Sequence, residues 1–304
     1  MKINNYSKKI HMVILFIMIF VLSVFKIIYI RREYLYLSTD YSIYILIFMP
    51  FIIFYALKQV DDMSSAVSLN WICTVPMSLY LYQSEYLYFK QYDMLLVYSV
   101  LGIFLNLIVF KKTPVRKIMP AVSGYITLNV LTLVGMIKEL IVGLNGNNYE
   151  QYCVLNILKN SNLFSASENS KQYLDSLFFL PGKGSKLYFI AEKTAQYGIV
   201  NVIIVFILLI GFFVLLFIEN YKRNNEISLI ATAIMIMQSM AFLLVNLGIL
   251  RGSVYELPLL KENIVYSLCQ LLLFGIALDI KGWIFHIRNK ILCGYHMSRN
   301  GWDV

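Results

Sequence analysis

The segment from Ile199 to Ile218 reads IVNVIIVFILLIGFFVLLFI and contains no charged side chain. An α-helix of about 20 apolar residues is long enough to cross the hydrocarbon core of a bilayer. Backbone N–H and C=O groups must be paired in lipid, so such a segment is accommodated there as a helix. It therefore predicts a transmembrane helix and restricts the chain to helical membrane-protein folds.

The rest of the chain repeats this pattern. Charged residues make up only 14% of the 304 residues, whereas a typical soluble domain has about 25%. The N-terminal apolar run lacks a small-residue cleavage site, so we interpret it as a first helix and not as a signal peptide. We predict an all-α, polytopic membrane protein with about eight spanning helices. The expected ranges are His11–Ile30, Tyr41–Leu57, Met63–Ser84, Met94–Phe110, Ile118–Ile137, Ile199–Ile218, Ile227–Leu250 and Asn263–Ile280.

Lysine and arginine in the short loops predict the topology, because cytoplasmic loops are enriched in these residues. The segment Lys111–Lys117 (KKTPVRK) holds four basic residues and no acid, and Lys222–Arg223 mark a second basic loop. Both loops and both termini are therefore predicted to be cytoplasmic. The loop from Gly143 to Tyr188 is then extracytoplasmic. The pair Arg31–Arg32 disagrees with this topology, because it falls on the outer side.

The charge and the cysteines exclude several other classes of site. The net charge of +9 is explained by basic loops and anionic lipid headgroups, so no nucleic-acid partner is expected. The four cysteines form no CxxC motif and no Cys/His cluster, so neither a metal site nor a cofactor is predicted.

The central loop, Gly143 to Tyr188, is unusually long for a segment without structure or function. Leu155, Leu158 and Leu177 are interspersed with serine and asparagine, whereas a disordered tether would lack such apolar residues. We expect short amphipathic helices folded against the outer face of the bundle. The alternative is a partly ordered loop without a ligand.

A series of short motifs runs through this loop and beyond it. In chain order they are Tyr149-Glu150, Asn160–Phe164 (NSNLF), Asn169–Gln172 (NSKQ), Leu180-Pro181, Ile190–Glu192, Gly198, Asn246–Gly248, Leu257-Pro258 and Phe274–Ile280. In this order and spacing, the segment Met136–Ile280 resembles the SEDS family (RodA, FtsW and SpoVE), whose members are membrane glycosyltransferases that polymerise lipid II into peptidoglycan.

The resemblance implies a single integral membrane domain in the bacterial cytoplasmic membrane. Its parts would be divergent N-terminal helices at 11–142, the extracytoplasmic loop at 143–188, a three-helix SEDS-like part at 189–285 and a cytoplasmic tail at 286–304. The implied function lies in cell-wall (peptidoglycan) synthesis, cell shape, division or sporulation. The implied partners are membrane lipids, a polyprenyl-pyrophosphate-linked precursor and a membrane-anchored penicillin-binding protein.

The catalytic aspartate of the family is not found. Two ways of aligning the motifs put Lys186 or Gly184 at its position, and neither is an acid. Glycosyl transfer needs a positioned base, and Asp175 and Glu192 are the acids that could replace it. Glu192 could instead pair with Lys193 or lie in the first turn of its helix. Whether the chain is an enzyme stays open; an active chain would be a peptidoglycan glycosyltransferase using lipid II.

Two groups of residues are candidates for binding a substrate. Lys183 and Lys186 lie among glycines in PGKGSK, where backbone N–H groups and two cations could meet a pyrophosphate. A basic turn at the headgroups is the alternative. Arg251 could likewise meet a pyrophosphate or snorkel to the interface.

Asn246 is a polar residue inside an apolar run. Its default role is an interhelical hydrogen bond, with substrate binding as the alternative. Gly248 and Gly252 are four residues apart and are expected to form a small-residue packing face on the same helix.

Three functions are compatible with these residues. The first is a SEDS-like envelope protein that has lost or altered its polymerase chemistry and binds a polyprenyl-linked precursor or a transpeptidase. The second is an active lipid II glycosyltransferase with a relocated acid. The third is a polytopic transporter subunit or resistance-type membrane protein. Against the third, the six strongest spans carry no acid at mid-depth, where coupled transporters usually keep one.

Overall fold

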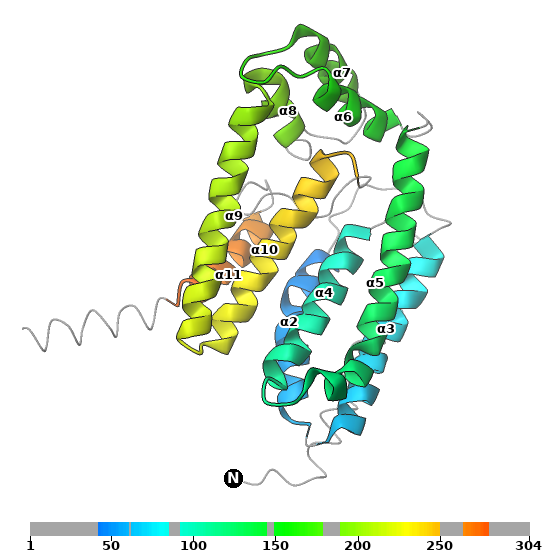
Figure 1. Cartoon of the computed structure of the whole chain (residues 1–304), viewed down its shortest axis with the longest axis vertical. Coiled ribbons are helices and arrows are strands. Elements are labelled where there is room, and N and C mark those ends of the chain that lie inside the picture. The colour runs from blue at the N-terminus through cyan, green and yellow to red at the C-terminus, as the bar shows by residue number, and fades with distance from the viewer. Residues whose placement is uncertain are drawn as a thin grey trace, which may run out of the picture.

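The computed structural model describes residues 42–60, 62–84, 92–144, 149–178, 189–249 and 264–279. The secondary structure within these ranges is entirely α-helical, which confirms the predicted all-α class for this part of the chain (Figure 1). The helices are α2 (Ser42–Lys58), α3 (Met63–Ser84), α4 (Tyr92–Val109), α5 (Val115–Leu144), α6 (Tyr149–Lys159), α7 (Glu168–Phe178), α8 (Phe189–Tyr197), α9 (Ile199–Lys222), α10 (Glu226–Asn246) and α11 (Ile264–Ala277).

Three helices in the described ranges are long and apolar enough to cross a membrane, namely Val115–Val142, Ile199–Lys222 and Glu226–Asn246. Shorter apolar helices are Phe48–Lys58, Leu95–Val109 and Ser267–Ala277. The expected total of about eight spans stays a prediction, because the segment His11–Ile30 lies outside the described residues.

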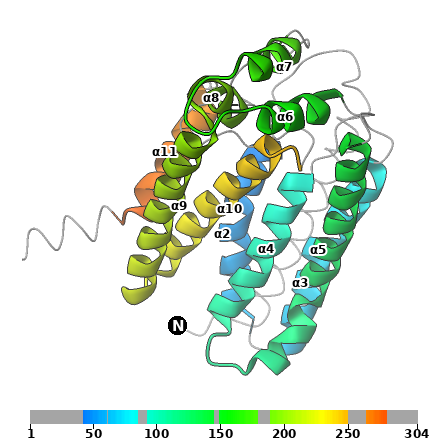
Figure 2. The same cartoon turned by 45° about the horizontal axis from the view of Figure 1, so that its top comes forward.

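The long helices form two groups that meet at α10. Helices α2 to α5 pack together in one group, and α9 and α11 pack against α10 in the other. Because α10 also packs against α2 and α4, it joins the two groups, as Figures 1 and 2 show. About 67% of the most apolar stretch of α10 is buried within the bundle, against 11% of the corresponding stretch of α9. The apolar side chains of α9 therefore form a surface suited to lipid and not to water.

Asparagine and glutamine side chains connect the helices inside the bundle. Asn70 of α3 and Asn106 of α4 exchange two hydrogen bonds, of 2.8 and 3.2 Å. Asn220 of α9 donates to Thr232 Oγ1 on α10 at 3.0 Å and to the Ala277 carbonyl of α11 at 2.8 Å. A polar group in an apolar interior needs a partner, so these amides stabilise one arrangement of the helices.

The two loops predicted to be cytoplasmic lie at the same end of the bundle. Lys111 Nζ, in the α4–α5 loop, donates to Asn224 Oδ1, in the α9–α10 turn, at 3.0 Å. At this end Lys58 of α2 also forms an ion pair with Glu226 of α10. Helices α6, α7 and α8 lie at the opposite end (Figure 1). This arrangement agrees with the topology expected from the basic residues.

Candidate functional site

Helices α6, α7 and α8, with the connecting residues 160–167, form a compact unit that we name the cap. The cap lies across one end of the bundle, where it contacts α5, α9 and α10 (Figure 2). The expectation of short helices folded against the bundle is confirmed for the described part of the central loop, because α6 and α7 both lie within 143–188.

An apolar core holds the cap onto the bundle. The side chains of α6 that point inward are spaced one and three residues apart, as expected for one face of a helix. They meet short side chains of α8, which allow the two helices to approach closely. The core consists of Cys153, Val154 and Ile157 of α6, Leu174 of α7, Ala191 and Ala195 of α8, and Tyr92, Met136 and Val245 from the long helices.

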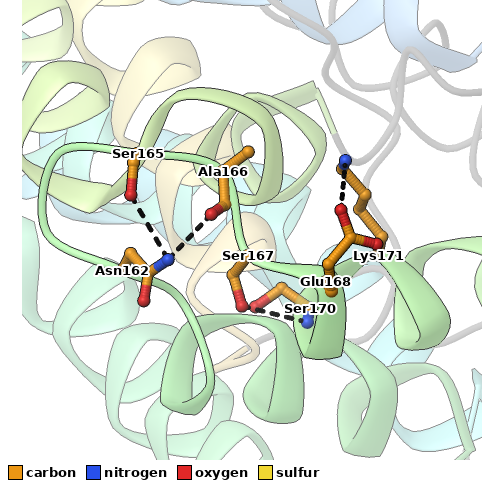
Figure 3. Close-up of polar contacts among 7 residues, drawn as sticks. All are labelled: Asn162, Ser165, Ala166, Ser167, Glu168, Ser170 and Lys171. Carbon is orange, nitrogen blue, oxygen red and sulfur yellow. Dashed lines mark hydrogen bonds and ion pairs between the residues drawn. The ribbon is translucent and has the colours of Figure 1, made fainter.

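The segment between α6 and α7 is ordered by its own polar side chains (Figure 3). Asn162 Nδ2 donates to the Ala166 carbonyl at 2.7 Å and to Ser165 Oγ at 3.3 Å. The Ser170 N–H donates to Ser167 Oγ at 3.3 Å, so Ser167 caps the first turn of α7. The motif NSNLF therefore lies in a turn that is held in one conformation.

The same segment caps α9. The N–H groups of Ile199 and Val200 donate to the carbonyls of Asn162 and Leu163, at 3.1 and 3.0 Å. Gly198 precedes α9 with φ +89°, and a Cβ atom there would lie 2.6 Å from the Leu163 carbonyl oxygen. Only glycine fits this junction, because the backbone conformation and the close carbonyl both exclude a side chain.

Asn246 connects α10 to the cap. Its Oδ1 accepts hydrogen bonds from the N–H groups of Ile190 and Ala191 at 3.0 and 3.3 Å, and its Nδ2 donates to the Phe242 carbonyl at 3.0 Å. The side chain is fully buried. Asn246 thus caps the N-terminus of α8 from a distant helix, which confirms the expected interhelical hydrogen bond. Its role toward a substrate stays a prediction.

The expected packing role of Gly248 within a helix is wrong. Helix α10 ends at Asn246 and not at Leu250, and Gly248 lies in the following turn with φ +71°. A Cβ atom on Gly248 would lie 2.9 Å from Leu155 Cγ, and its carbonyl accepts from Gln151 Nε2 at 3.3 Å. The glycine therefore lets the turn approach α6 closely. Its proposed helical partner, Gly252, lies outside the described residues.

The two candidate acids differ in their surroundings. Glu192 lies in the first turn of α8 with its side chain 15% exposed, and Lys193 Nζ lies 2.9 Å from its Oε1. Gln196 Nε2 donates to the same oxygen at 3.0 Å. The pairing of Glu192 with Lys193 is confirmed, so this carboxylate is already engaged. Asp175 is exposed on α7.

Only part of the predicted site can be placed. Asn246 binds the N–H groups of Ile190 and Ala191, which precede Glu192 in the first turn of α8, whereas Asp175 lies on another helix of the cap. The remaining candidates, Lys183, Lys186 and Arg251, lie outside the described residues. Sequence reasoning missed Gln151, which binds the turn after α10. No local signal could have found it, because its partner is 97 residues away.

Comparison with protein-family models, with curated proteins and with solved structures gives no match. The SEDS resemblance therefore stays a prediction from the order and spacing of the motifs in the sequence. Among the described residues, His, Cys, Asp and Glu side chains form no cluster of three that could hold a metal ion.

Proposed function

We propose that this chain is a SEDS-like envelope protein of the bacterial cytoplasmic membrane. In this proposal it binds a polyprenyl-linked cell-wall precursor or a membrane-anchored transpeptidase, and its polymerase chemistry is lost or altered. The supporting observation is that motifs of the resemblance contact other motifs or their neighbours at two places around the cap. The turn at 160–167 caps α9, and Asn246 caps the helix that carries Ile190–Glu192. A chance match of scattered motifs would not need to bring them into contact.

The position of the cap supports a ligand that is part lipid and part polar. Leu163, Phe164 and Tyr197 are exposed large apolar side chains next to the first turn of α9. A polyprenyl-linked precursor presents an apolar chain inside the membrane and a pyrophosphate and sugars just outside it. Apolar side chains at the end of a spanning helix, beside a polar cap, match this division.

The chemistry of the cap favours binding over polymerisation. Transfer of a glycan forms a glycosidic bond to a sugar hydroxyl, whose proton must go to a base, while polyprenyl pyrophosphate leaves with the bonding electrons. Glu192 is mostly buried and bound by Lys193 and Gln196, so it is poorly suited to take that proton. Asp175 is exposed on α7, and it is the acid that an active variant would have to use.

A glycosyltransferase assay with purified full chain and lipid II tests this proposal. We expect lipid II to bind and to raise the thermal stability of the chain, without formation of glycan polymer. Formation of glycan polymer by the wild type would contradict the proposed loss of polymerase activity. Asp175→Ala and Glu192→Ala would then identify the acid. Glu168→Ala serves as a control, because Glu168 is an exposed cap acid that pairs with Lys171 at 3.1 Å.

Affinity purification separates this proposal from a role in transport. Co-purification of a penicillin-binding protein with the full chain is the expected result. Co-purification of an ATPase, with no stabilisation by lipid II, would instead support a transporter subunit.

A further inference from the structure

The end of the bundle opposite the cap is strongly basic. Two of its cations are neutralised within the described chain: Arg223 Nε lies 2.9 Å from Glu219 Oε1, and Lys58 pairs with Glu226. Five others, Lys111, Lys112, Arg116, Lys117 and Lys222, are exposed and form no ion pair with any residue that the structure describes. We name these five the basic foot.

The basic foot is built from two loops that are held together. Lys111 donates to the side-chain oxygen of Asn224 at 3.0 Å, which joins the α4–α5 loop to the turn that follows Lys222. Arg116 and Lys117 lie in the first turn of α5. Like charges brought together repel one another, so an anionic partner that neutralises them would stabilise the arrangement.

Apolar side chains are exposed among these cations. Val115 is 62% exposed and Met119 is 49% exposed, and they lie one helical turn apart on the same face of α5. Between them Ile118 is buried in the bundle, so this part of α5 is anchored. Exposed apolar residues interleaved with Lys and Arg at the end of a spanning helix are typical of an interface with lipid headgroups.

We propose that the basic foot binds the headgroups of anionic phospholipids in the adjacent leaflet. Val115 and Met119 insert among the first carbons of the acyl chains, and Lys112, Arg116 and Lys117 meet the phosphates. Each Lys or Arg close to an anionic membrane surface strengthens binding by a factor of about five. The interaction is independent of the proposed cell-wall function, because it lies at the other end of the molecule.

The test uses a tryptophan reporter at Met119 in the full chain, with Trp71, Trp283 and Trp302 replaced by phenylalanine. The protein is reconstituted in bilayers of phosphatidylcholine containing brominated phosphatidylglycerol or brominated phosphatidylcholine. Bromine quenches nearby tryptophan, so the ratio of quenching gives the local preference between the two lipids. We expect a several-fold preference for phosphatidylglycerol. This preference should decrease with added salt, because the Debye screening length falls to about 3 Å at 1 M ionic strength.

Three variants decide the outcome. The triple substitution Lys112→Gln, Arg116→Gln, Lys117→Gln should remove most of the preference. The charge-conserving double substitution Lys112→Arg, Lys117→Arg should keep the preference. This variant separates the effect of lost charge from any effect of the substitutions on folding. A matched triple at the cap end, Lys138→Gln, Lys159→Gln, Lys171→Gln, should leave the Met119 reporter unchanged. Equal quenching by both lipids in the wild type, or a preference that survives the first triple, would overturn the proposal.

Discussion

Asn246 uses both polar atoms of its side-chain amide, one between helices and one within its own helix. The oxygen accepts from two N–H groups at the start of α8, and the nitrogen donates to the Phe242 carbonyl one turn earlier in its own helix. Without this oxygen, two backbone donors at the start of α8 would be left without their partner in a buried place, where an unpaired polar group is costly. Asn246 therefore contributes to stability through α8 as well as through α10.

Replacing Asn246 by alanine should lower the free energy of unfolding by about 1–2 kcal/mol, because a helix cap is lost at a buried site. Titration of the purified protein with denaturing detergent in mixed micelles measures this change. Asn201→Ala is the matched control, since Asn201 Nδ2 makes the same bond to the carbonyl four residues earlier, at 2.9 Å, on an exposed face of α9. Equal effects of the two substitutions would contradict the capping role.

The sequence identified Asn246 as unusual but could not supply its partner. A polar residue in an apolar run predicts a hydrogen bond across a helix interface, and that was found. The partner is a pair of backbone N–H groups 55 and 56 residues away. Backbone groups are the same in every residue, so no side-chain pattern could point to them.

At the scale of the element, the junction between the cap and α9 depends on Gly198. Substitution by alanine places a Cβ atom 2.6 Å from the Leu163 carbonyl oxygen and forces a positive φ on a residue with a side chain. The second effect alone costs about 1–3 kcal/mol, because φ +89° with ψ 156° is a region that essentially only glycine occupies. We expect Gly198→Ala to lower the temperature of thermal unfolding and to increase proteolysis between α6 and α9.

Gly211 provides the comparison within the same helix. A Cβ atom at Gly211 would meet no other atom within 4 Å, and alanine favours a helix over glycine by about 1 kcal/mol. Gly211→Ala should therefore leave stability unchanged or raise it slightly. If both alanine variants behave alike, the strained junction at Gly198 is not important.

The helices were predicted well in their cores and less well at their ends. The range Met63–Ser84 was predicted with the bounds that α3 has. Helix α9 continues to Lys222, beyond the last apolar residue, because a backbone helix does not end where the lipid ends. Helix α10 ends early although Leu247, Ile249 and Leu250 are apolar, because Gly248 turns the chain. Hydropathy alone does not detect such a turn.

At the scale of the whole molecule, the cap and the basic foot should lie on opposite sides of the membrane. Ser165→Cys, in the exposed turn of the cap, should react with a membrane-impermeant maleimide in intact cells. Lys112→Cys should react only after the cells are permeabilised. Both are made in a chain whose native cysteines are replaced by serine. Labelling of both positions in intact cells would contradict the topology.

The sequence does not predict how the two groups of helices pack against each other. Helix lengths and basic loops predict how often and in which direction the chain crosses, but not which helix is central. The buried position of α10 follows from its contacts with α2, α4, α9 and α11, all of which depend on side-chain fit. The small residues Ala231, Ala233 and Ala241, now seen to be buried, are what permits those close approaches.

The contact between Asn246 and α8 also sets an order of events during biosynthesis. Ile190 is synthesised 56 residues before Asn246, so the first turn of α8 leaves the ribosome before the side chain that accepts its N–H groups. The N-terminus of α8 can be closed only after α9 and α10 have been inserted. A nascent chain stalled before Asn246 would therefore lack the acceptor for the first N–H groups of α8, and the cap could reach its final packing only after α10 is in place.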